Sequence, residues 1–178
     1  MFERFAQERD PQTDLLDDWC EATLDPLAAG AGLRAVYPWQ KPYLPFLTWA
    51  RKAGAGQASP LGMNIHPVYG LWHGFRGALI FEGPTDLGAG APAPSHPCQS
   101  CAEKPCLSAC PVDAFVKDSE LPFDPARCVS YLQSTGGISC LNHGCRARLA
   151  CPIGRNYAYT PEQIRFHLSA FYRDRTVN

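Results

Sequence analysis

Eight of the nine cysteines lie between residues 98 and 151 and fall into two sets. The first set is Cys98, Cys101, Cys106 and Cys110, followed by Pro111, and the second is Cys128, Cys140, Cys145 and Cys151, followed by Pro152. Each set offers four thiolates, which is the number that a four-iron cluster or an all-cysteine zinc site takes. The cysteine spacing therefore predicts metal chemistry in this part of the chain.

The proline that ends each set favours iron–sulfur clusters. In two-cluster ferredoxins, three cysteines of a run bind one cluster, and a fourth, followed by proline, binds the other. Residues 107–109 supply the single helical turn before the fourth cysteine, and Pro111 ends that turn because it has no amide hydrogen. The expected ligand sets of two [4Fe-4S] clusters are therefore crossed: Cys98, Cys101, Cys106 and Cys151 for one, and Cys110, Cys128, Cys140 and Cys145 for the other.

Zinc is the main alternative to iron–sulfur clusters at these cysteines, and a structural zinc or iron–sulfur module that mediates assembly is an alternative function. C-x2-C pairs occur in zinc ribbons, but those sites usually use two well-separated pairs rather than four close cysteines ending in Cys-Pro. Disulfides or unoccupied thiols are a third possibility.

Composition and charge limit the other functions. The formal net charge of −1 argues against a nucleic-acid binder that depends on phosphate contacts. No segment approaches the roughly 20 apolar residues of a membrane span, and the first ten residues lack the apolar stretch of a signal peptide. We therefore expect a cytoplasmic protein, in which cysteines bind metal rather than form disulfides.

The run "CQSCAEKPCLSACPVDAF" resembles the cluster-binding run of bacterial-type 4Fe-4S ferredoxin domains. "HPVYGLWHGFRGALIF" before it and "RCVSYL" after it are similar to stretches of the epoxyqueuosine reductase family, over roughly residues 62–152. The first of these stretches also resembles cobalamin-processing proteins of the nitroreductase-like class. The resemblance implies clusters that reduce a bound corrinoid, although the second cysteine set is more widely spaced than in the reductases and no D-x-H-x-x-G motif is present.

Several other residues are candidates for a role near the metal. His143 lies inside the second cysteine set, but we interpret it as a surface loop residue rather than a ligand. Arg146, Arg148 and Arg155 flank Cys145 and Cys151 and would offset cluster charge, form a solvated basic edge or dock an acidic redox partner. We interpret Cys20 and the four tryptophans, Trp19, Trp39, Trp49 and Trp72, as core residues.

The expected fold is α+β. A small helical and β-hairpin N-terminal part (1–95), with a possible nitroreductase-like origin, would pack on a ferredoxin-like module with two [4Fe-4S] clusters (96–157), followed by a C-terminal helix and tail (158–178). Apolar spacing predicts helices over 14–24, after Thr13, and 44–53. A strand is expected at 34–37, a loop at 54–60, two paired strands within 63–81 and a low-complexity connector over 82–97. Thr160, Pro161 and Gln163 form a capping box that predicts a helix over 161–172.

The expected function is electron transfer between redox partner proteins. We find no recognisable catalytic nucleophile, P-loop or zinc-protease motif in the sequence, so the clusters would carry the chemistry. The alternatives are a redox enzyme resembling epoxyqueuosine reductase, in which the clusters reduce a corrinoid, and a structural metal module.

Overall fold

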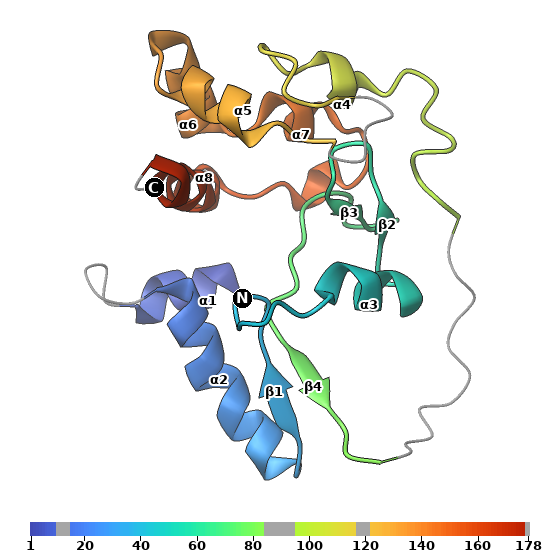
Figure 1. The fold of residues 1–178 in the computed structure, drawn as a ribbon, viewed down its shortest axis with the longest axis vertical. Coiled ribbons are helices and arrows are strands. Elements are labelled where there is room, and N and C mark those ends of the chain that lie inside the picture. Colours follow the sequence, from blue (N-terminus) through green and yellow to red (C-terminus); the bar gives the residue numbers. More distant parts are fainter. Residues whose placement is uncertain (10–14, 84–94, 117–121, 177–178) are drawn as a thin grey trace. The chain divides into compact units, whose positions relative to one another are not determined.

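The computed structural model describes residues 1–9, 15–83, 95–116 and 122–176. It is a mixed α+β structure, mostly helical, with two small antiparallel sheets of two strands each (Figure 1). The chain divides into two compact units. Residues 1–49 and 74–91 form the first unit, and residues 50–73 and 92–178 form the second.

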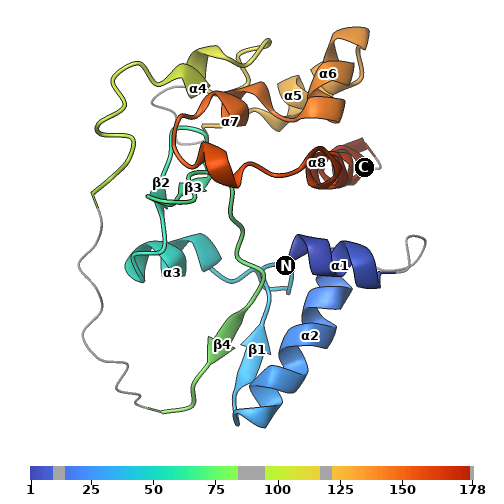
Figure 2. The same cartoon turned by 180° about the vertical axis from the view of Figure 1, so that it is seen from behind.

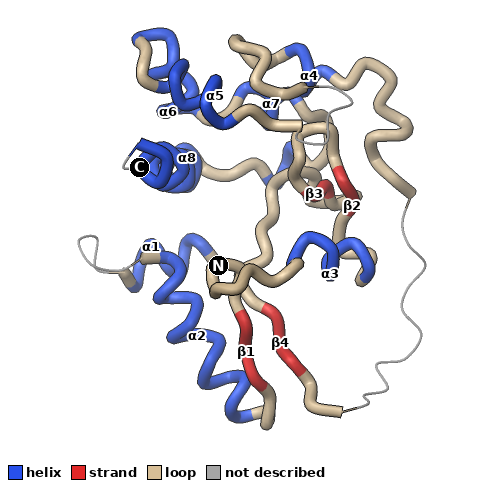
Figure 3. The backbone as a smooth tube through the Cα atoms, viewed as in Figure 1, coloured by secondary structure: helices blue, strands red, loops and turns tan. Residues whose placement is uncertain are grey.

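The first unit contains two helices and one of the sheets. Helices α1 (Phe2–Glu8) and α2 (Leu16–Gly30) precede β1 (Arg34–Val36), which pairs antiparallel with β4 (Ala78–Ile80) (Figure 3). Helix α3 (Phe46–Lys52) begins in this unit and ends in the second. The fully buried side chains of this unit are Phe5, Cys20 and Tyr37. The interpretation of Cys20 as a core residue is therefore confirmed.

The expected N-terminal helix is longer than its apolar spacing indicates. It runs to Gly30 and passes through Pro26, whereas the sequence pattern predicts an end at residue 24. The helix continues past Pro26 because Ala28 is buried. The packing of this part of the helix compensates for the backbone hydrogen bond that is lost at the proline. Thr13 lies outside the described residues. Helix α1 was not expected, and it packs through Phe2 and Phe5.

The second unit contains the other sheet and the cysteine-rich helices. Strand β2 (Gln57–Ala58) pairs antiparallel with β3 (Asn64–Ile65), and a bridge between His66 and Gly70 closes the loop that follows. Helices α4 (Pro105–Ser108), α5 (Pro125–Leu132), α6 (Ile138–His143), α7 (Arg146–Ala150) and α8 (Pro161–Thr176) complete the unit, with short 3-10 turns at Thr135–Gly137 and Arg155–Tyr157 (Figure 2).

The two strands expected within residues 63–81 exist, but they do not pair with each other. Strand β3 pairs with β2, which lies in the segment predicted to be a loop, and β4 pairs with β1. A strand of two or three residues has too few side chains to specify its pairing partner. The partner is therefore determined by which side chains distant in sequence are buried together. The predicted hairpin is therefore wrong. Most of the predicted connector, residues 84–94, lies outside the described residues.

The helix boundaries near the cysteines follow from local capping. Asp124 accepts a hydrogen bond from the amide of Arg127 at 2.9 Å, and Pro125 occupies the first turn of α5. Thr160 accepts one from the amide of Gln163 at 3.2 Å at the start of α8. The predicted C-terminal helix is confirmed, and it extends to Thr176. The turn predicted at residues 107–109 before Cys110 is replaced by α4, which begins two residues earlier, at Pro105, and ends at Ser108.

Among the residues that the structure describes, no helix has the length and apolar character needed to cross a membrane.

Candidate metal centres

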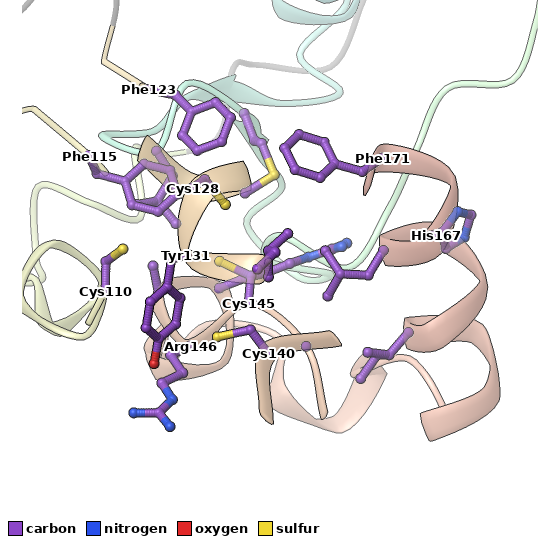
Figure 4. A pocket seen from close by; sticks show the side chains of 18 of the residues that line it. Cys110, Phe115, Phe123, Cys128, Tyr131, Cys140, Cys145, Arg146, His167 and Phe171 are labelled. Atoms are coloured by element: carbon purple, nitrogen blue, oxygen red, sulfur yellow. The ribbon is translucent and has the colours of Figure 1, made fainter. Parts of the chain in front are cut away.

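Four thiols of the second unit line one cavity of about 350 Å³. Cys110 follows α4, Cys128 lies on α5, Cys140 on α6, and Cys145 immediately precedes α7. Figure 4 shows these four side chains around the same space, each contributed by a different part of the chain. They are the four residues that the crossed arrangement assigns to one cluster.

The remaining wall of the cavity is mainly apolar. Helix α8 packs against α5 and α6 and supplies Ile164, Leu168 and Phe171. Phe115 and Phe123, which stack with ring centroids 5.1 Å apart, close another side. An apolar cavity that converging thiols also line can exclude water from a bound group, and exclusion of water is one of the factors that set a cluster's potential.

Burial raises the pKa of three of these thiols, those of Cys128, Cys140 and Cys145. It raises the pKa of Cys128 to about 11, and the nearby thiols of Cys145, Cys110 and Cys140 raise it further. Burial also raises the pKa of Cys145, although backbone hydrogen bonds from Arg148 and Ala147 act in the opposite direction. Four thiolates at this site repel one another, so their ionised form requires a cationic partner such as a metal.

Cys110 ends the first cysteine set, but it lines the cavity together with Cys128, Cys140 and Cys145 of the second set. It raises the pKa of Cys128, Cys140 and Cys145 through its charge, but it is not among the causes of the shifts at Cys98 and Cys106. The backbone amide of Ala114 donates to its sulfur at 3.3 Å, which fixes the side chain after the turn at Pro111.

The core beside the cavity touches cysteines of both predicted ligand sets, since Cys110 and Cys145 pack against it as well as Cys98 and Cys106. Cys151 is buried with Leu61, Ile65, Leu71 and Ala147, and Cys98 and Cys106 pack against this core. Burial raises the pKa of Cys98 and of Cys106, and the charges of Cys151 and Cys101 contribute in both cases. Cys151 is thus the cysteine of the second set whose charge acts on Cys98 and Cys106 of the first set.

All nine cysteines lie in the described part of the chain and are free thiols. Within the described residues, no three His, Cys, Asp or Glu side chains come close enough together to hold a single metal ion. A single zinc ion draws four sulfurs to about 2.3 Å from one point. A four-iron cluster takes one thiolate at each of four irons, so its ligands stand further apart.

The other candidates take different positions. His143 is exposed and its Nδ1 lies 3.2 Å from the carbonyl oxygen of Ser139 on its own helix. The exposed Arg146 lowers the pKa of Cys140 through its charge, against the dominant effect of burial. Nε of Arg155 donates to the carbonyl oxygen of Cys151 at 3.4 Å.

The sequence did not reveal the role of Arg148. Its guanidinium donates twice to the carbonyl of Leu71, and its central carbon lies 4.4 Å from the ring centroid of Trp72 and 4.6 Å from that of Tyr159. The interpretation of Trp72 as a core residue is confirmed, since it is 7% exposed. Only its position on the same cavity as the cysteines was unforeseen.

Comparisons of the chain with protein-family models, with curated proteins and with solved structures found no match. The functional argument therefore depends on the residues of this chain.

Proposed function

We propose that this chain is an iron–sulfur electron-transfer protein. Two [4Fe-4S] clusters would be held by the crossed ligand sets, one by Cys98, Cys101, Cys106 and Cys151 and the other by Cys110, Cys128, Cys140 and Cys145. The observation that carries the proposal is the apolar cavity of about 350 Å³ onto which four cysteines from four segments converge. In fold terms, the second unit would be a ferredoxin-like module with two clusters.

When bound, such clusters accept and release single electrons. The chain's own residues would set the conditions for that exchange. Phe115, Phe123 and Phe171 exclude water from one site, and the amide of Ala114 donates to the Cys110 sulfur. Arg146 places a positive charge beside Cys140, which offsets the negative charge of four thiolates.

The connection between the two sites is short. Helix α7 has five residues and lies directly between Cys145, assigned to one cluster, and Cys151, assigned to the other. At about 1.5 Å rise per residue, the backbones of these two cysteines are roughly 9 Å apart. Two clusters anchored at the ends of so short a helix would be near enough for an electron to enter at one and leave from the other.

The charge of the second unit suits an acidic redox partner. Over residues 50–73 and 92–178, eleven lysines and arginines outnumber seven aspartates and glutamates. The exposed Arg146 and Arg175 act on Cys140 and Cys128 respectively, so positive charge flanks the cavity from both α7 and α8. An acidic surface would be drawn to this side of the unit.

Anaerobic reduction followed by reoxidation tests the proposed function. Protein reduced with dithionite should bleach in the visible range, and a one-electron acceptor should restore its absorbance without any added corrinoid. A protein with structural zinc would show no visible change with either reagent. If reoxidation required added cobalamin, the reductase-like alternative would replace simple electron transfer.

A further inference from the structure

The indole nitrogen of Trp72 is a buried donor that no described residue accepts from. Trp72 is 7% exposed, and its Nε1 has no hydrogen-bond partner among the residues that the structure describes. Buried tryptophan N–H groups usually find a partner, because an unsatisfied buried donor costs about 1–3 kcal/mol. This unpaired donor therefore indicates an acceptor outside the described part of the chain.

The ring of Trp72 is held in place by its neighbours. The Arg148 guanidinium stacks over it at 4.4 Å, and the ring of Tyr159 meets it edge-on with centroids 5.4 Å apart. Arg148 is itself fixed by hydrogen bonds from its Nε and Nη2 to the carbonyl oxygen of Leu71, at 3.1 and 2.5 Å. Because these contacts restrain the ring, the N–H cannot readily turn toward another acceptor.

Trp72 lines the cavity that Cys110, Cys128, Cys140 and Cys145 also line. The wall between them is mainly apolar, so an apolar occupant would leave the indole N–H unpaired. The sulfur atoms of an iron–sulfur cluster accept hydrogen bonds, and such bonds are among the factors that set its reduction potential.

We propose that the Trp72 indole N–H donates a hydrogen bond to the iron–sulfur cluster held by Cys110, Cys128, Cys140 and Cys145. Trp72 is in this sense a tuning residue that raises the potential of that cluster, because reduction adds negative charge and the donor stabilises it. The inference rests on the proposed function and selects one of the two clusters.

The test compares Trp72→Phe with the wild type by EPR-monitored redox titration, after iron and sulfide have been measured in each. The variant should keep its clusters, and one of the two potentials should become more negative while the other stays the same. A tenfold change in the reduction equilibrium corresponds to 59 mV for one electron. Trp49→Phe is the matched control, because Trp49 packs against Phe46 and does not line the cavity, and it should move neither potential.

A second measurement covers the case in which Trp72→Phe loses its cluster. Wild-type protein carrying tryptophan labelled with ¹⁵N in the indole should show a nitrogen coupling in pulsed EPR of the reduced state. The inference would be overturned if Trp72→Phe kept both clusters with unchanged potentials. It would also be overturned if the labelled wild-type protein kept its clusters but showed no nitrogen coupling. Either result would leave the proposed function standing. Wild-type protein without clusters would instead defeat the proposed function.

Discussion

Gly70 and Gly154 meet backbone to backbone in the second unit. Both have left-handed backbone angles, with φ of +57° and +71°. A Cβ on Gly70 would lie closer than 3.0 Å to the carbonyl of Ile153, and a Cβ on Gly154 would lie equally close to the carbonyl of Tyr69. This contact joins the loop that precedes Trp72 to the segment that follows Cys151.

Replacing Gly70 with alanine should disrupt this junction. Gly70→Ala combines a disfavoured backbone angle with a clash against main-chain atoms that cannot rotate away, so we expect a loss of more than about 3 kcal/mol in unfolding free energy. The cluster bound by Cys151 should be lost at a lower denaturant concentration than in the wild type. Urea unfolding followed by circular dichroism and visible absorbance measures both effects.

The control is Gly62→Ala in the same unit. Gly62 has φ +75°, but a Cβ there would meet only a side-chain carbon of Pro122 at 3.2 Å. This substitution should cost about 1–2 kcal/mol, the penalty of the left-handed conformation for a residue with a Cβ. Equal losses in the two variants would show that the contact between Gly70 and Gly154 is not required.

The crossed ligand sets predict which cysteines act together. Cys98→Ala and Cys151→Ala should each remove one cluster, and the double variant should retain the other, with about four irons per chain. Combining Cys98→Ala with Cys110→Ala should remove both clusters. Iron and sulfide analysis after anaerobic purification measures these contents, with Cys20→Ala as a control that keeps both clusters. If the variant lacking Cys98 and Cys110 kept four irons, the ligand sets would be sequential rather than crossed.

Charge reversal at Arg146 should slow reduction by an acidic redox protein. At low salt, reduction by an acidic flavodoxin should be at least about tenfold slower in Arg146→Glu than in the wild type. The difference in reduction rate between Arg146→Glu and the wild type should shrink near 1 M salt, because charges more than about 3 Å apart are then screened from each other. Arg165→Glu carries the same charge change on a residue of α8 that does not line the cavity and should have a much smaller effect. Stopped-flow traces with equal slowing in both variants would remove Arg146 from the docking surface.

The first unit should lose stability in alkaline solution. The Tyr37 hydroxyl is buried and donates to Asp25 at 2.7 Å, and burial followed by this hydrogen bond raises its pKa above the ordinary value. Above about pH 10 the unfolded chain releases the tyrosine proton while the folded chain keeps it, so unfolding becomes more favourable as pH rises. Below that pH the tyrosine is neutral in both states and its contribution is fully present.

Tyr37→Phe isolates this contribution. The variant should lose about 1 kcal/mol at pH 7 with the hydrogen bond to Asp25, and its stability should fall less steeply than that of the wild type between pH 9 and pH 11. Urea midpoints across this range give both slopes. Parallel slopes would mean that Tyr37 titrates alike in the folded and unfolded states.

Some local features of this protein could be predicted from its sequence, whereas helix α1 and strand β2 were not foreseen. The helix beginning at Pro161 depends on proline and capping residues close in the chain and forms as expected, and a helical turn forms before Cys110 with bounds shifted from those predicted. The partners of β3 and β4 were predicted wrongly, because strands of two and three residues pair according to distant burial. The cavity that Trp72 shares with Cys110, Cys128, Cys140 and Cys145 depends on packing between residues 38 to 73 positions apart, which spacing alone does not reveal.

Iron, acid-labile sulfide and zinc in anaerobically purified protein, together with EPR of the dithionite-reduced sample, test the central claim most directly. Two four-iron clusters require about eight irons and eight sulfides per chain, and a reduced sample with the EPR signal of paramagnetic clusters. Colourless protein containing zinc in place of iron, with no sulfide and no EPR signal, would contradict the account.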